Sequence, residues 1–213
     1  MSSKHFLKSL FILFIGSFSF GHPVSYKDGF GIMSYNSHDM NEILLTYSLS
    51  PKFAVATTYL RDSKSEFYIP RVNFLLNRWN EDDSQANFYL SGGSGIEKYD
   101  SKNTSVNLAE VIVDWETRKY YVYFEHLYLK RANELNPALT NLDYNHTKFR
   151  LGFAPFLADY KDLNIWLITQ FEKHNDEKQI EATQFLRFYI KNVLWEIGSG
   201  FDGSFKFNFM IHL

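Results

Sequence analysis

The last ten residues, Ser204-Phe-Lys-Phe-Asn-Phe-Met-Ile-His-Leu213, decide the fold. Every second residue from Phe205 to Leu213 is apolar, whereas the residues between them are mostly polar. An alternation of period two predicts a β-strand with one apolar and one polar face. Lys206, Asn208 and Met210 are then expected on the inner, water-facing side, opposite an unbroken aromatic and aliphatic row.

The composition fits a chain built from many such strands. The 213 residues include 21 Phe and 14 Tyr, yet the mean hydropathy is only −0.28. Strands that face lipid on one side and water on the other produce this combination. No stretch has the roughly 18 apolar residues expected of a transmembrane helix. The net charge of −2, with no long block of one sign, argues against a nucleic-acid partner. The lack of cysteine excludes disulfides and thiolate metal sites.

The N-terminus has the pattern of a secretory signal peptide. Lys4 and Lys8 precede an apolar run at 10–15, and Ser19-Phe-Gly21 places small residues at the positions that signal peptidase requires. We expect cleavage after Gly21, so that the mature chain begins at His22-Pro23. The predicted organisation is a signal peptide at 1–21, a periplasmic leader at 22–28 and an outer-membrane β-barrel at 29–213.

Alternation and turn residues predict about twelve strands, and the uncertainty of their boundaries leaves room for ten to fourteen. Pro70 predicts a local irregularity in one of them, and Gly92–Gly95 predicts a bent strand end rather than a phosphate loop. The expected strands are 29–36, 41–50, 53–62, 66–79, 85–95, 105–117, 120–132, 143–156, 163–173, 179–190, 193–200 and 204–213.

The connections sort by length if the strands alternate in direction. The shorter ones at 51–52, 80–84, 118–119, 157–162 and 191–192 fall on the side of the N-terminus, whereas those at 96–104, 133–142 and 174–178 fall opposite. Outer-membrane barrels have short periplasmic turns and longer external loops. We therefore predict an all-β protein, a transmembrane antiparallel up-and-down barrel in the outer membrane of a Gram-negative bacterium. Both termini would be periplasmic, lipid and the barrel assembly machinery would be its partners, and a monomer is favoured.

The polar face of these strands supplies the candidate lumen residues. Mixed charges in a small lumen fit either buried ion pairs that fill the barrel or a narrow polar conduit. The strand with Glu110, Asp114 and Glu116 is the candidate for cation preference. The full set is Glu42, Arg71, Asn73, Glu110, Asp114, Glu116, Lys148, Arg150, Glu172, Glu181, Arg187, Glu196 and Lys206.

Histidines suggest two kinds of chemistry. His126 and His146 would suit a hydrolase, but no serine motif such as G-x-S-x-G accompanies them, so we expect no enzyme. A free amine on His22 together with its imidazole would suit Cu or Zn, and His212 lies at the same end of a closed barrel. The alternative is that His22 is an incidental terminal residue. We expect no other cofactor.

Several phrases resemble those of a family of small uncharacterised bacterial outer-membrane β-barrel proteins. They are HPVSYKDGFGIMSYN at 22–36, FLLNRWNEDDSQANFYLSGG at 74–93, LGFAPFLADYKDLNIW at 151–166, KNVLWEIG at 191–198 and FMIHL at 209–213. Because that family is associated with heavy-metal efflux gene neighbourhoods, the resemblance implies a role related to metals, but it implies no functional residues.

Two functions follow as expectations. The first is a narrow transport or solute-binding barrel of unknown substrate, linked to metal-cation homeostasis. The alternative is a structural or adhesive outer-membrane protein whose lumen is plugged by side chains and whose extracellular loops interact with partners.

Overall fold

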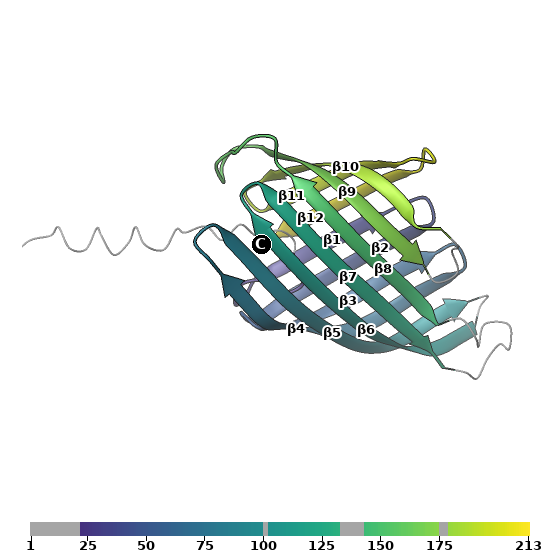
Figure 1. Ribbon diagram of the computed structural model, residues 1–213. Helices are drawn as coiled ribbons and strands as arrows, with labels where there is room; N and C mark the ends of the chain where they lie inside the picture. Colours follow the sequence, from purple (N-terminus) through teal and green to yellow (C-terminus); the bar gives the residue numbers. More distant parts are fainter. Residues whose placement is uncertain (1–21, 100–101, 133–142, 175–178) are drawn as a thin grey trace, which may run out of the picture.

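The chain forms a closed antiparallel β-barrel of twelve strands (Figure 1). A computed structural model describes residues 22–99, 102–132, 143–174 and 179–213. In chain order the strands are β1 (Phe30–Asn36), β2 (Met40–Ser50), β3 (Phe53–Asp62), β4 (Ser65–Asn80), β5 (Ser84–Tyr99), β6 (Lys102–Thr117), β7 (Tyr120–Arg131), β8 (Tyr144–Phe153), β9 (Asn164–His174), β10 (Glu181–Ile190), β11 (Val193–Gly200) and β12 (Phe205–His212). No helix in these ranges is long and apolar enough to cross a membrane.

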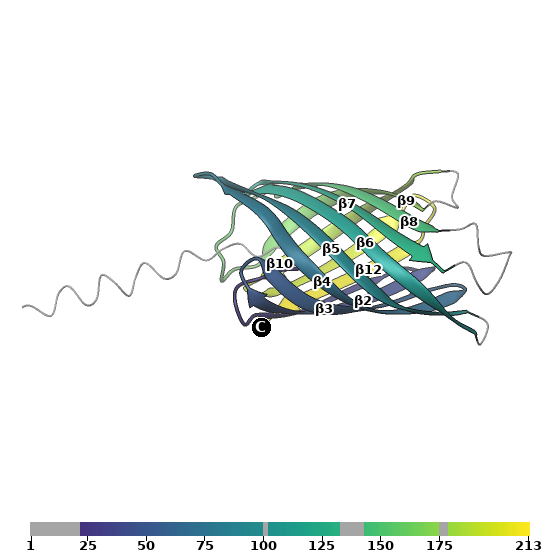
Figure 2. The same cartoon turned by 90° about the horizontal axis from the view of Figure 1, so that it is seen from below.

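The barrel closes because β12 pairs with β1. Each strand is antiparallel to the next, and the ladder from Gly31↔His212 to Asn36↔Phe207 joins the two ends of the sheet. Beyond it, the backbones of Phe30 and Leu213 exchange hydrogen bonds of 2.9 and 2.7 Å. Figure 2 shows the strands tilted around the axis on all sides. Closure leaves no unpaired strand edge, which would otherwise invite aggregation. The predicted fold class is confirmed.

The two faces of β12 are distributed as its alternation predicts. Phe205 and Phe207 are exposed on the exterior, whereas Lys206, Asn208 and His212 are buried in the interior. The same holds around the barrel, where exposed large apolar side chains occur on every strand from β2 to β12. Lipid is the solvent that suits such an exterior.

Aromatic side chains pair across neighbouring strands at both ends of the exterior. Phe53–Phe74, Tyr120–Phe153 and Phe188–Trp195 lie at one end, with ring centroids 4.9, 5.9 and 5.6 Å apart. Tyr59–Tyr68 lies at the other, with centroids 5.0 Å apart. Aromatic girdles at the two levels of the membrane interface are typical of transmembrane barrels.

The two ends of the barrel differ in their connections. The end that contains Phe30 and Leu213 also contains the turns at 51–52, 81–83, 118–119, 154–163 and 191–192, and we call it the terminal end. The opposite end contains the connections at 37–39, 63–64, 100–101, 132–143, 175–180 and 201–204, and we call it the loop end. In Figure 1 the terminal end lies on the left.

Strand boundaries agree closely with the predictions in several places and depart in others; the strand predicted at 143–156, for example, ends at Phe153. The bounds of β3 and β11 are those predicted from the sequence. The polar loop predicted at 96–104 is wrong, because β5 continues to Tyr99 and β6 begins at Lys102. Polar residues at the tip of this hairpin extend the ladder, with Lys98 opposite Asn103.

The glycine-rich stretch lies in the interior of β5, so the expected bent strand end is also wrong. A Cβ atom at Gly95 would collide with the carbonyl oxygen of Tyr68 in β4. The ladder between β4 and β5 is interrupted beside Pro70, as the proline predicts, and resumes at Arg71↔Gly93. The glycines therefore let two backbones approach closely at a proline.

A β-bulge reverses the faces of β4. The register with β5 shifts between Leu75 and Asn77, so Asn77 is exposed, although simple alternation places it inside. Arg78 points inward instead and donates hydrogen bonds to Asn87 (2.6 Å) and Tyr89 (3.3 Å). The predicted signal peptide, the predicted loop 133–142 and residues 175–178 lie outside the described residues.

Candidate functional site

The lumen contains the polar residues singled out from the sequence. Glu181 is half-buried, and the others are no more than 8% exposed; they are Glu42, Arg71, Asn73, Glu110, Asp114, Glu116, Lys148, Arg150, Glu172, Arg187, Glu196 and Lys206. Burial of so many charges requires ionic partners, because a lone ion is costly away from water.

A central layer of ion pairs lies inside the wall formed by β8 to β12, between the two ends of the barrel. Glu196 accepts hydrogen bonds from Arg150 of β8 (2.8 Å), Arg187 of β10 (2.6 Å) and Asn208 of β12 (2.7 Å), so that two guanidinium groups share one carboxylate. The cavity beside this layer has a volume of only about 30 Å³, enough for about one water molecule. The central layer, defined by these four residues, therefore leaves little free space beside it.

Two further pairs support this packing. Arg71 of β4 binds Glu110 of β6. Lys148 of β8 lies 3.0 Å from Glu125 of β7. Glu110 is therefore neutralised, and the three acids predicted to give β6 a cation preference do not form one site. Asp114 and Glu116 lie closer to the terminal end.

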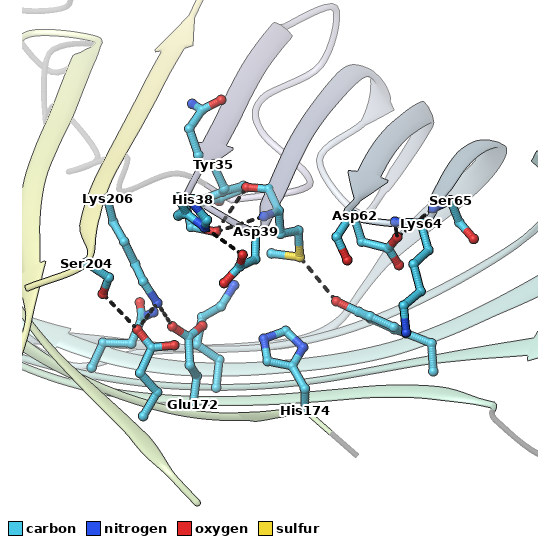
Figure 3. Close-up of a pocket in the computed structure, with 18 of the residues that line it drawn as sticks. Tyr35, His38, Asp39, Asp62, Lys64, Ser65, Glu172, His174, Ser204 and Lys206 are labelled. Carbon is cyan, nitrogen blue, oxygen red and sulfur yellow. Dashed lines mark hydrogen bonds and ion pairs between the residues drawn. The ribbon is translucent and has the colours of Figure 1, made fainter. Parts of the chain in front are cut away.

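A cavity of about 320 Å³ opens into the lumen from the loop end. Figure 3 shows residues of its wall, among them the loop residues His38 and Asp39 and the strand residues Glu172 and Lys206. Its lining contains six carboxylates and four lysine or arginine side chains. The carboxylates are Asp39, Asp62, Asp143, Glu172, Glu181 and Asp202. An acidic wall of this kind favours cations over anions.

Three side chains on β8 and β9 converge at this cavity and form what we call the loop-end cluster: His146, Glu172 and His174. One ligand atom of each lies within 4.8 Å of the others. His146 pairs with His174 across the ladder, and their rings stack with centroids 4.0 Å apart. His146 Nε2 is hydrogen-bonded to Glu172 Oε2 at 3.1 Å. Two imidazoles and a carboxylate are ligands that suit Zn²⁺ and Cu²⁺.

Lys206 of β12 contacts the same carboxylate, although two strands separate β12 from β9. Its Nζ contacts Glu172 and lies 2.7 Å from Glu181 Oε1 (Figure 3). Because Lys206 has two carboxylate partners, it keeps one of them if Glu172 turns toward a metal ion. The positive charge of Lys206 then remains neutralised.

The segment 22–24 enters the lumen at the terminal end. His22, Pro23 and Val24 are all buried, and Val24 belongs to an apolar cluster with Ala54, Leu75, Tyr89 and Ile112. The carbonyl oxygen of Pro23 accepts a hydrogen bond of 3.1 Å from Asn73 Nδ2. The first three residues of the predicted leader therefore pack inside the barrel, whereas 26–28 are exposed.

The first residue of this segment, His22, belongs to a second cluster of polar side chains. We call it the terminal-end cluster, and its members are His22, Asp114, Glu116 and His212. His22 stacks on Tyr89 with centroids 5.5 Å apart, and its Nδ1 lies 3.4 Å from Asp114 Oδ2. His212 is buried near the end of β12, at the same end of the barrel. Hence His22 and His212, which the sequence places at the same end, are both buried inside the barrel at that end.

The histidines considered for hydrolysis do not come together. His126 lies on the exterior and is hydrogen-bonded to Thr147 at 2.9 Å, whereas His146 is buried in the lumen. Sequence reasoning missed His146 and His174 as a pair. Each of them lies an even number of residues from the other inward-facing residues of its strand, so alternation places both inside the barrel. Only the register between β8 and β9 places them opposite each other.

Sequence reasoning also missed that much of the lumen is apolar. Inward-facing aromatic and aliphatic side chains form the core on all sides of the ion pairs; among them are Met33, Leu44, Tyr89, Tyr121, Trp166, Ile168 and Phe185. In β7 this makes both faces aromatic, so its alternation is weak in the sequence.

Comparisons with known proteins find likeness at the level of structure. No family model and no curated protein matches the chain. A solved "KdgM porin" aligns with a TM-score of 0.47 and 9% identity, covering 86% of this chain and 97% of that one. The "KdgM porin in complex with disordered oligogalacturonate" gives 0.48 and 11% over the same shares. OccAB4 of Acinetobacter baumannii gives 0.41 and 8%, covering 85% of this chain and 56% of that one. At such scores and identities, none of these likenesses carries an argument about what this chain binds.

Proposed function

We propose that this chain is an outer-membrane β-barrel that takes a transition-metal cation from the medium into its loop-end cavity. The observation that carries the proposal is the loop-end cluster, where ligand atoms of His146, Glu172 and His174 lie within 4.8 Å of one another. Imidazole selects transition metals over Mg²⁺ and Ca²⁺, which prefer oxygen ligands. Zn²⁺ and Cu²⁺ are therefore the expected solutes.

The membrane location is supported by the exterior. Apolar side chains cover the outer wall, aromatic pairs lie at both ends, and charged groups are concentrated inside. In this proposal the terminal end faces the periplasm, so the cavity of about 320 Å³ faces the medium. Its acidic wall raises the local concentration of cations.

The arrangement at the cluster suits reversible capture. An ion that binds Nε2 of His146 replaces its hydrogen bond to Glu172, and the proton of that bond moves to Nδ1 of the ring or to water in the cavity. His174 is only partly buried and lines the cavity, so the ion reaches it first. We propose no catalytic role for these residues.

Calorimetric titration of the purified, folded barrel with Zn²⁺ tests the proposal. The double variant H146A/H174A should bind one ion fewer per barrel than the wild type. The variant H126N is the matched control, because His126 lies on the exterior next to the same strand pair. An unchanged number of ions and unchanged affinity in H146A/H174A would contradict the proposal.

The filled lumen favours a second candidate function, a structural barrel. The central layer and the buried segment 22–24 both close the interior. Vesicles that contain a trapped fluorescent zinc indicator, together with the titration above, separate the two functions. Zn²⁺ entry faster than in protein-free vesicles supports transport, whereas equal rates together with no loss of bound ion in H146A/H174A support the structural role.

A further inference from the structure

We infer that the terminal-end cluster binds one transition-metal ion, Cu²⁺ or Zn²⁺, which holds the segment 22–24 inside the barrel. The proposed ligands are His22, Asp114 and His212. This inference goes beyond the capture of an ion at the loop end, because the ligands lie at the opposite end of the lumen, beyond the central layer.

The first argument is that the cluster contains buried polar atoms without hydrogen-bond partners. Among the described residues, these atoms include Asp114 Oδ2, Glu116 Oε2, His22 Nε2 and both ring nitrogens of His212. Each of the four side chains belongs to a residue at most 7% exposed. Buried polar groups are nearly always paired in folded proteins, so a group of unpaired ones indicates a missing ion or water.

The second argument is the distance between His22 and Asp114. The separation of 3.4 Å between Nδ1 and Oδ2 is long for a hydrogen bond between a nitrogen and an oxygen. Two ligands that each lie about 2.1 Å from one tetrahedral ion are about 3.4 Å apart. The pair is therefore spaced as two ligands of a common ion.

The third argument is that the protein fixes His22 from several sides. Its ring stacks on Tyr89, the next residue is held by Asn73, and Val24 is completely buried. Positioning of this kind reduces the entropy lost when an ion binds. These contacts also argue against the alternative that His22 is an incidental terminal residue.

His212 completes the site by a rotation of its side chain. The terminal-end ligands do not form a three-ligand group within 4.8 Å, as the loop-end cluster does among the described residues. Neither ring nitrogen of His212 has a hydrogen bond to lose on turning. The backbone of His212 stays in place, because its N–H donates to the carbonyl oxygen of Asn192 at 3.0 Å.

The predicted cleavage after Gly21 would add a fourth ligand. The freed α-amine and Nδ1 of His22 can bind the same ion, and Pro23 has no backbone N–H that could compete. An amine, two imidazoles and a carboxylate form a set that suits Cu²⁺ or Zn²⁺. The acids Asp114 and Glu116 balance the charge of the ion.

Titration with Cu²⁺ in the H146A/H174A background tests the inference without a contribution from the loop-end cluster. This background should bind one ion per barrel, and adding H212A or D114N should weaken binding at least tenfold. H126N in the same background is the control and should bind as the background does. Equal affinity with and without H212A, or no bound ion in the background, would overturn the inference.

A second variant changes no residue of the barrel and covers the case in which H212A or D114N fails to fold. One glycine inserted between Gly21 and His22 moves the α-amine away from the site. Zn²⁺ is the probe for this variant, because Cu²⁺ would bind a Gly-His terminus through its amine, its amide nitrogen and the imidazole. Bound Zn²⁺ should protect the amine of the background protein from an amine-reactive label, and the insertion should abolish this protection. Equal labelling with and without Zn²⁺ in the background protein would overturn the inference.

Discussion

At the scale of residues, Glu196 carries the most concentrated set of interactions in the lumen. It serves two arginines and Asn208, and it is 1% exposed. A buried ion pair contributes little net stability compared with apolar residues, but removal of one partner leaves the other charge unpaired. The central layer therefore depends on this single carboxylate.

We predict that E196Q lowers the free energy of unfolding by about 3 kcal/mol, because two buried guanidinium groups lose their counter-ion. Guanidinium chloride unfolding in lipid vesicles measures the effect. E81Q serves as the control, since Glu81 is exposed in the turn between β4 and β5. Equal unfolding free energies for E196Q and E81Q would show that the central layer is not held by charge.

At the scale of elements, the glycines of β5 mark the close approach to β4. A Cβ at Gly95 would collide with a carbonyl oxygen of β4, whereas the nearest atom to a Cβ at Gly92 is 3.8 Å away. G95A should therefore destabilise the barrel by about 2 kcal/mol, a cost typical of overpacking. G92A is the matched control and should cost less than half as much. Indistinguishable unfolding free energies for the two variants would refute the close approach.

The segment 22–28 is the second element with a testable position. Ser25 N–H donates to Ser48 Oγ at 2.9 Å, and Asp28 N–H donates to the carbonyl oxygen of Ser48 at 2.7 Å. V24D should expel the segment, because it places a charge among apolar side chains, and these amides should then exchange hydrogen at least tenfold faster. Hydrogen-exchange mass spectrometry measures this. Y26S should leave exchange slow, since Tyr26 is exposed; fast exchange in the wild type would contradict the packed segment.

The elements also show how far the sequence predicts this fold. Strands such as β3 and β12 follow from alternation, because one face meets lipid and the other the lumen. The reversal at Asn77 could not be predicted, since a bulge arises from the register with the neighbouring strand. The same applies to His146 and His174: each has inward parity, but only the pairing of β8 with β9 makes them neighbours. The burial of His22 and His212 at the same end of the barrel was partly predictable, because closure joins the ends of the chain.

At the scale of the whole molecule, the proposed orientation places the loop end outside the cell. The chain contains no cysteine, so single cysteines report location without interference. S63C at the loop end should be labelled by a membrane-impermeant maleimide on intact cells, whereas D83C at the terminal end should be labelled only after lysis. Both residues are exposed in turns. Labelling of D83C, but not S63C, on intact cells would reverse the orientation.

The barrel as a whole has its two histidine clusters at opposite ends, separated by the central layer. This division gives the proposed function a direction, from an outward-facing cavity toward a site at the terminal end. The closed wall keeps both clusters in fixed register, because each ligand except His22 lies on a strand of the sheet. A rigid scaffold of this kind suits selective binding of an ion.

The most direct test of metal capture is an anomalous difference map from crystals grown with Zn²⁺ and measured at the zinc absorption edge. We predict a peak at the loop-end cluster, about 2.1 Å from a nitrogen of His146, a nitrogen of His174 and an oxygen of Glu172. A map with no peak among these three side chains, despite zinc bound elsewhere or free in the crystal, would contradict the account.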